Sequence, residues 1–284
     1  MKYLKNNFAT GLFILAFFGL VFKAFIAQNL TINENLITRA LTSYLIAYLA
    51  FKISFMETKK VGLMFIPLIF HSLILALIVG GGFFAKIPRD LLQIITSLYK
   101  LMVMVGVFFI LELIFNKLVG SLATSVLGGL SFLIFIAVVF SKKFDILRPF
   151  EDFFLYFSFY VMAIRVRSAA KLNPALIILA ILLVIGEIYL RDRYKFDYDF
   201  LLSLFPLTYL SLKTVTNESV FTFMDYMIFA LIYIYPAIFV IIKTRVSMES
   251  LAISIISILT SYIASEIIYK VKNKYLSYLL LGIN

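Results

Sequence analysis

The stretch VGSLATSVLGGLSFLIFIAVVF, residues 119–140, contains neither a charged side chain nor a proline. A helix needs about 20 predominantly apolar residues to cross the hydrocarbon core of a bilayer. The apolar residues here follow one another without the period-two alternation that a strand of a membrane barrel would show. The stretch therefore predicts a helix that spans a membrane.

Similar apolar segments recur along the whole 284-residue chain, separated by charges, prolines or clusters of Asn and Gly. The predicted spans are Phe8–Ala27, Leu36–Phe55, Val61–Ala85, Leu91–Phe115, Val119–Phe140, Phe150–Ile164, Pro174–Leu190, Phe200–Leu212, Val220–Ile242 and Leu251–Ile268. The sixth and the eighth are short. Because backbone polar groups in lipid must be satisfied internally, we expect an all-α, polytopic membrane helix bundle of about ten transmembrane helices, with little chain outside the bilayer.

The composition supports a membrane protein and excludes several kinds of site. The chain is 63% hydrophobic and 14% charged, whereas soluble domains are roughly 25% charged. It contains no Cys and one His, which excludes disulfides, thiolate metal sites, Cys nucleophiles and multi-histidine metal or haem sites. We therefore expect no cofactor, no metal and no catalytic residue.

The basic residues indicate membrane lipids, and no nucleic acid, as partners. The net charge is +11, but the 26 Lys and Arg residues are scattered singly or in short groups between the apolar segments, as in helices that end at anionic headgroups. They divide almost equally between the two sides of the predicted bundle, so the positive-inside rule does not orient it. The richness in Lys, Ile, Phe and Asn favours a bacterium, and the expected location is its cytoplasmic (inner) membrane.

A short internal repeat divides the chain in two. Residues 121–125 read SLATS and residues 250–254 read SLAIS, and each follows a long apolar segment. Five predicted spans precede residue 141 and five follow it, and an odd number in each half gives the halves opposite orientations. We therefore predict two inverted five-helix repeats, residues 1–141 and 142–284.

Four short motifs lie near the ends of predicted spans. The second span opens on ENLITR, residues 34–39, and the third runs into GGGFFAKIP, residues 80–88. In the second half, YIYPAIF at residues 233–239 precedes KTRVS at residues 243–247.

In this order, these features resemble the EamA-like permeases of the drug/metabolite transporter superfamily. The resemblance covers nearly the whole chain and implies ten helices in two inverted repeats. The sequence departs from the family pattern at three places. Val105-Gly106-Val107 stands where the family has a proline in helix four, and Lys243 or Thr244 replaces the usual Glu after helix nine. The Gly-rich pattern of helices five and ten remains only at residues 128–129.

Ionisable side chains inside the predicted spans are candidate functional residues, because each costs roughly 2.5–3.5 kcal/mol at the centre of a bilayer. His71, midway along the third span, is either a packing residue or a contact for substrate or a proton. In the fourth span, Lys100 either extends its ammonium to the interface or lies at the bottom of the substrate site, where its positive charge binds an anionic group of the substrate. Glu112, near the end of the same span, is expected to reach headgroups or Lys117.

Glu187 and Asp225 are the candidates for proton coupling, since a carboxylate in an apolar site can take up and release protons. Glu187 also has Arg191 four residues later as a possible salt-bridge partner, and Asp225 lies where a negative charge favours a helix N-terminus. Pro236 predicts a kink in the ninth span. The neighbouring Tyr233 and Tyr235, with Asp225, are further candidates for substrate binding, and a packing kink is the alternative.

The resemblance implies a secondary active transporter of a small organic metabolite, an amino acid or a nucleoside-type solute such as S-adenosylmethionine, working by alternating access. The expected partners are a small-molecule substrate and membrane lipids, and both a monomer and a homodimer remain open. The chain has no glycine-rich nucleotide-binding motif. Two alternatives remain, a multi-span membrane enzyme of the acyltransferase type and a permease subunit of a larger complex. We expect no enzyme activity, because no acid accompanies His71 in a His–acid motif.

Overall fold

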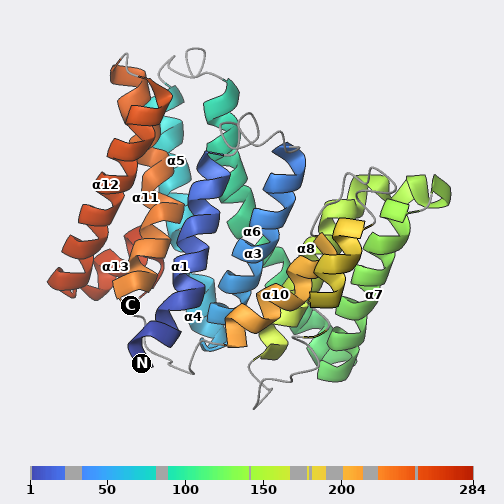
Figure 1. Cartoon of the computed structure of the whole chain (residues 1–284). Coiled ribbons are helices and arrows are strands. Elements are labelled where there is room, and N and C mark those ends of the chain that lie inside the picture. The colour runs from blue at the N-terminus through green and yellow to red at the C-terminus, as the bar shows by residue number, and fades with distance from the viewer. Residues whose placement is uncertain are drawn as a thin grey trace. The chain divides into compact units, whose positions relative to one another are not determined.

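The computed structural model describes residues 2–22, 34–80, 89–140, 142–166, 178, 181–189, 201–213, 223–246 and 249–283. Within these ranges the chain is helical apart from short turns, and no β-strand is present (Figure 1). The predicted all-α fold class is confirmed in the part of the chain that the structure describes.

Two compact units make up the fold. Unit 1 consists of Met1–Phe55 and Val107–Asn217, and unit 2 of Met56–Gly106 and Glu218–Asn284. Each unit therefore combines segments from both predicted halves, 1–141 and 142–284. The compact units are not the predicted repeats, and the inverted repeat itself stays a prediction.

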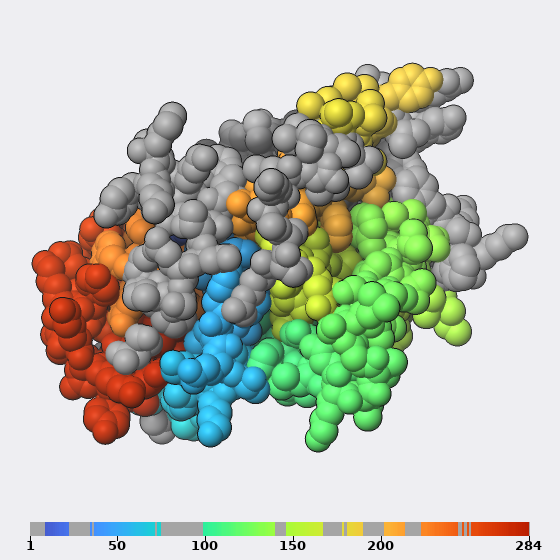
Figure 2. Space-filling view, turned by 90° about the horizontal axis from the view of Figure 1, so that it is seen from below, coloured from blue at the N-terminus to red at the C-terminus, as the bar shows by residue number. Residues whose placement is uncertain are grey.

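Unit 1 is built around α8. Its described elements are α1 (Lys2–Val21), α3 (Glu34–Ile53), the later part of α6 (Arg89–Leu118), α7 (Ser121–Phe140), the 3-10 helix η2 (Lys142–Phe150), α8 (Glu151–Val166), the helical residues 181–189 and α10 (Leu201–Lys213). α8 packs against α3, α7 and α10, and most of its side chains are buried. In Figure 2 the green side chains of α7 lie against the yellow-green ones of α8.

Two of these helices approach closely where a glycine faces a neighbour. A Cβ atom at Gly128 of α7 would lie 2.6 Å from Val161 Cγ1 of α8. Only a residue without a side chain allows this separation, so Gly128 sets how near α7 lies to α8.

Unit 2 is built around α11. Its described elements are α4 (Thr58–Leu63), α5 (Ile66–Gly80), the first part of α6, α11 (Phe223–Arg245), α12 (Ser250–Val271) and α13 (Lys274–Leu281). α11 packs against α5, α12 and α13, and α11 and α12 lie side by side as orange and red helices in Figure 1.

Four described helical segments are long and apolar enough to cross a membrane: Tyr99–Leu118, Ser121–Val139, Phe223–Lys243 and Leu251–Val271. A shorter apolar helix covers Ala9–Val21. These segments indicate a membrane protein. The full set of ten spans, the multi-pass topology and the inner-membrane location stay predictions.

The third predicted span, Val61–Ala85, differs from the structure because it contains a break. α4 ends at Leu63 and α5 begins at Ile66, and the amides of Met64 and Phe65 bond three residues back, to Val61 and Gly62. Pro67 explains the break, since it lacks an amide proton and its ring clashes with the carbonyl four residues earlier. Both sides of the break are apolar, so a search for apolar runs alone reads them as one helix.

Candidate functional site

A cluster of buried aromatic and polar side chains lies in unit 2 and contains two of the predicted residues. His71 of α5 and Tyr233 of α11 are stacked, with ring centroids 6.1 Å apart and planes 9° from parallel. His71 is 4% exposed and Tyr233 is fully buried. Tyr99, from the first part of α6 in the same unit, lies near Tyr233 and has a buried hydroxyl. We call His71, Tyr99 and Tyr233 the polar cluster.

Two hydrogen-bonding atoms of the polar cluster have no partner among the residues that the structure describes. His71 Nε2 lies 3.1 Å from the carbonyl oxygen of Leu280. Because a carbonyl only accepts, the proton of a neutral His71 is assigned to Nε2, and Nδ1 is then an acceptor. Nδ1 is buried and has no hydrogen-bond partner among the described residues, and the same holds for the hydroxyl of Tyr99. A buried acceptor and a buried hydroxyl are thus available to a ligand.

The break between α4 and α5 adjoins this cluster. The Tyr233 hydroxyl donates to the carbonyl oxygen of Met64 at 2.5 Å, and Met64 lies in the break. Gly282, with φ +71°, also packs here: a Cβ atom at this position would lie 2.6 Å from Met64 Cα. Interrupted helices with backbone groups turned toward side chains are typical of the substrate sites of secondary transporters.

The remaining candidates in unit 2 lie outside the polar cluster. Tyr235 directs its hydroxyl to Ser254 Oγ of α12, 3.5 Å away. Asp225 is 1% exposed, but it precedes Tyr233 by two helical turns, about 12 Å along the axis. Lys100 is exposed although its neighbour Tyr99 contributes to the cluster. Pro236 is buried in α11, which continues without interruption from Phe223 to Arg245, so the kink stays a prediction.

Glu187, in unit 1, caps the start of α10. Its Oε1 accepts the amides of Leu202 at 2.6 Å and Ser203 at 3.2 Å, and its Oε2 accepts the Ser203 hydroxyl at 2.5 Å. The carboxylate therefore satisfies amides that have no partner within the helix, at the positive end of the helix dipole. Arg191, the expected partner, lies outside the described residues. Proton coupling by Glu187 stays a prediction beside this structural role.

Glu112 is the centre of a network that the sequence analysis missed. Its Oε2 accepts the Tyr160 hydroxyl at 2.9 Å and its Oε1 accepts Asn116 Nδ2 at 3.1 Å, while Asn116 Oδ1 accepts the Thr124 hydroxyl at 2.7 Å. The network ties α6, α7 and α8 together instead of sending Glu112 to headgroups or to Lys117. The four-residue spacing of Glu112 and Asn116 was the available signal.

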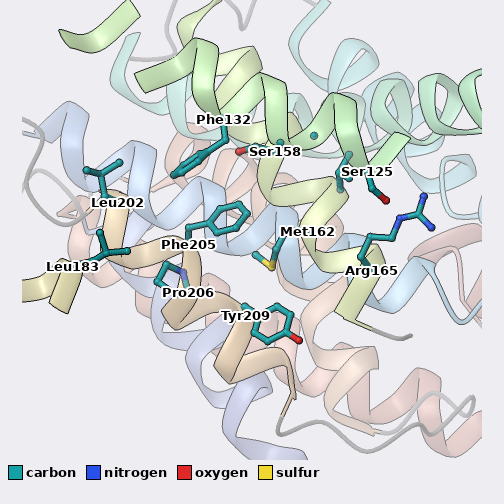
Figure 3. Close-up of a pocket in the computed structure, with 13 residues that line it drawn as sticks. Ser125, Phe132, Ser158, Met162, Arg165, Leu183, Leu202, Phe205, Pro206 and Tyr209 are labelled. Carbon is teal, nitrogen blue, oxygen red and sulfur yellow. The ribbon is translucent and has the colours of Figure 1, made fainter. Parts of the chain in front are cut away.

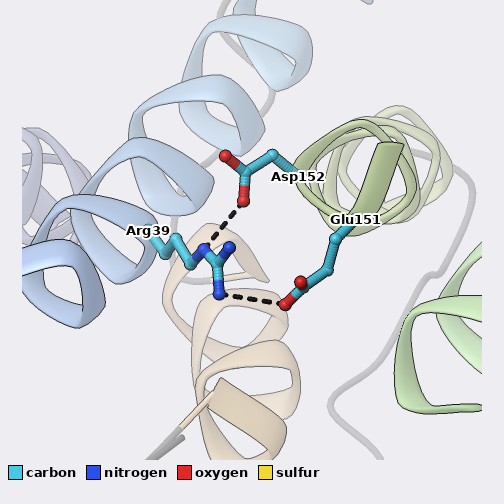
Figure 4. A network of polar contacts seen from close by, with 3 residues as sticks. All are labelled: Arg39, Glu151 and Asp152. Atoms are coloured by element: carbon cyan, nitrogen blue, oxygen red, sulfur yellow. Dashed lines mark hydrogen bonds and ion pairs between the residues drawn. The ribbon is translucent and has the colours of Figure 1, made fainter. Parts of the chain in front are cut away.

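A second missed contact joins α3 to the first turn of α8 (Figure 4). Arg39 Nη1 lies 2.9 Å from Glu151 Oε1, and Arg39 Nε lies 2.8 Å from Asp152 Oδ1. The Glu151 side chain is 5% exposed and the Asp152 side chain 47%. The two acids also lie where the dipole of α8 favours negative charge, so the arrangement is a structural clamp between the two helices.

Neither the family models, the curated proteins nor the solved structures compared with this chain give a match. Within the described ranges, no three His, Asp or Glu side chains are grouped so that they could hold a metal ion. The polar cluster is therefore the candidate site in the part of the chain that the structure describes.

Proposed function

We propose that the chain is a secondary active transporter of a small organic metabolite. In this proposal it is an EamA-like permease of the drug/metabolite transporter superfamily, in a bacterial inner membrane, that works by alternating access between two inverted repeats. The observation that carries the proposal is the buried His71 Nδ1, which has no hydrogen-bond partner in the described structure and lies beside a broken helix.

The energetics favour a ligand for this atom. An unsatisfied polar group in a protein interior costs roughly 1–3 kcal/mol, and such groups are retained where a ligand, water or proton uses them. In the polar cluster, His71 Nδ1 accepts and the Tyr99 hydroxyl both donates and accepts. A solute with its own donor and acceptor groups fits both atoms, and amino acids and nucleoside-type solutes such as S-adenosylmethionine belong to this class.

His71 also offers a means of coupling transport to protons. A proton on Nδ1 would turn this acceptor into a donor, so a solute would meet a different site before and after protonation. Protonation of His71 would therefore change the affinity of the site for the solute, and bound solute would change the affinity of His71 for a proton. We therefore propose symport or antiport with protons through His71.

The direct test is solute uptake and counterflow by the full chain in proteoliposomes. A panel of radiolabelled amino acids and nucleosides is offered with and without a pH gradient. We expect saturable counterflow of one solute class, and a response of net uptake to the gradient. Absence of flux for every solute, in vesicles shown to contain folded protein, would reject the carrier and favour a permease subunit or a membrane enzyme.

A further inference from the structure

Unit 1 contains an apolar pocket that the proposed transport does not use. Its volume is about 460 Å³, within the roughly 300–1,000 Å³ of pockets that bind small molecules. The walls come from α7, α8, α10 and Leu183, and include Gly129, Phe132, Met162 and Phe205 (Figure 3). Because Gly129 is exposed and both phenylalanines are partly exposed, the pocket opens to the surface of the unit.

The two serine hydroxyls in the pocket walls need no hydrogen bond from a ligand. Ser125 Oγ donates to the carbonyl of Ser121 at 3.3 Å, and Ser158 Oγ donates to the carbonyl of Leu155 at 2.6 Å. Both hydroxyl protons are therefore used within their own helices. An apolar ligand can therefore lie against Ser125 and Ser158 without leaving either hydroxyl donor unsatisfied.

Positive charge lies at one end of the pocket. Figure 3 shows Arg165 at the end opposite to Leu183 and Leu202. Arg165 Nη2 donates to the carbonyl of Ser121 at 2.5 Å, at the start of α7. The ammonium of Lys213 lies 5.9 Å from the ring centroid of Tyr209, which also lines the pocket. Lys213 Nζ is buried and without a hydrogen-bond partner in the described part of the chain.

These charges lie where a lipid headgroup is expected. Arg165 and Lys213 are in the last turns of α8 and α10, and basic residues at the ends of membrane helices contact anionic headgroups. Beside the pocket, α7 exposes Leu122, Val126 and Leu133 by 54–79%. Such a surface requires lipid around it, so acyl chains adjoin the opening.

We propose that this pocket holds an acyl chain of an anionic phospholipid, with the lipid phosphate at Arg165 and Lys213. The chain lies along α8 and α10 toward Leu183 and Leu202. The pocket is thus a lipid site, separate in chemistry from the polar cluster, because the serine hydroxyls of its described walls are used within their own helices.

The absence of Trp from the chain provides a direct test. Phe132→Trp puts a single tryptophan, which can be excited selectively over the 17 tyrosines, in the pocket of the full protein. The protein is reconstituted in phosphatidylcholine vesicles that contain increasing fractions of dibrominated phosphatidylglycerol or, separately, dibrominated phosphatidylcholine. We expect quenching to show roughly a 25-fold preference for phosphatidylglycerol, because each of the two basic residues near the headgroup contributes about fivefold.

Matched variants separate the pocket from general lipid contact. Leu122→Trp, on the 79% exposed outer face of α7, should be quenched equally by the two lipids. Arg165→Gln with Lys213→Gln should abolish the preference seen at Phe132→Trp, whereas Lys59→Gln, an exposed change in α4, should retain it. Tyr209→Trp serves as the reporter if Phe132→Trp does not fold. Equal quenching by both lipids at the pocket, no quenching there, or a preference that survives the double variant would overturn the proposal.

Discussion

The acids of unit 1 and the polar cluster of unit 2 are both surrounded by apolar helices, but they differ in how their hydrogen-bonding capacity is used. Glu112, Glu151 and Glu187 each accept donors from a neighbouring element. In unit 2, His71 keeps a buried nitrogen without a partner among the described residues. Satisfied groups fix the relative positions of helices, whereas an unsatisfied group destabilises the fold, and we propose that a ligand satisfies it.

The largest loss of stability is expected for Arg39→Ala. It leaves Glu151, whose side chain is 5% exposed, as a buried acid without its cation, and removal of one partner of a buried pair costs about 3 kcal/mol. Thermal unfolding in detergent should show a clearly lower midpoint. Lys270→Ala is the matched control, because its pair with Glu266 is exposed, with side-chain exposures of 72% and 40%, and its midpoint should hardly change. Equal midpoints for the two variants would remove the distinction between buried and exposed pairs.

Glu187→Ala is expected to have the next largest effect. It removes the acceptor for two amides and one hydroxyl at the start of α10, and the loss of a helix cap costs about 1–2 kcal/mol. Hydrogen exchange should increase in the first turn of α10 before it increases in α3. Unchanged exchange at Leu202 and Ser203 would show that the cap does not stabilise the helix.

Tyr160→Phe should cost about 1 kcal/mol, because one hydrogen bond to Glu112 is lost while the ring stays in the core. Tyr160 is fully buried and its ring lies 5.6 Å from that of Phe108. The melting midpoint of Tyr160→Phe combined with Glu112→Leu should be no lower than that of Glu112→Leu alone, because leucine offers no acceptor and the hydrogen bond is then already lost. Additive losses would mean that the two side chains act independently.

The smallest effect is expected for Asp152→Asn. Its side chain is 47% exposed, and exposed ion pairs contribute about 0.5 kcal/mol or less. The melting midpoint should stay within the error of the wild type. A loss as large as that of Arg39→Ala would mean that Asp152, rather than Glu151, holds the arginine.

Hydropathy predicted the bounds of α7 and α12 closely, but it did not predict how deeply each apolar helix is buried in the protein. Val119–Phe140 was expected and α7 covers Ser121–Phe140; Leu251–Ile268 was expected and α12 covers Ser250–Val271. Yet the apolar segment Phe223–Lys243 of α11 is 78% buried, whereas Leu251–Val271 of α12 is 33% buried. Their mean hydropathies are nevertheless similar, 2.1 and 1.9. Lipid and a protein core select the same apolar side chains, so composition does not separate a central helix from a peripheral one.

The candidate site was predictable only in part for a similar reason. His71 and Tyr233 were recognised because a polar group in an apolar run stands out. Tyr99 was not, since its role depends on its position near Tyr233, a residue distant in sequence. Lys100 was chosen, although the structure leaves it exposed. Pro67 was an available signal for the break in the third span. Tyr160, which donates to Glu112, and Arg39, which pairs with Glu151, come from helices distant in sequence, which no local pattern reveals.

The central claim is that the polar cluster, and not the satisfied acids, is the working site of a carrier. The most direct measurement compares initial counterflow rates of His71→Ala and Glu187→Gln in proteoliposomes with equal amounts of folded protein. We predict that His71→Ala loses most of the flux while Glu187→Gln keeps it, although the second variant weakens the contacts of Glu187 with the start of α10. Full flux in His71→Ala, or a loss confined to Glu187→Gln, would contradict the account.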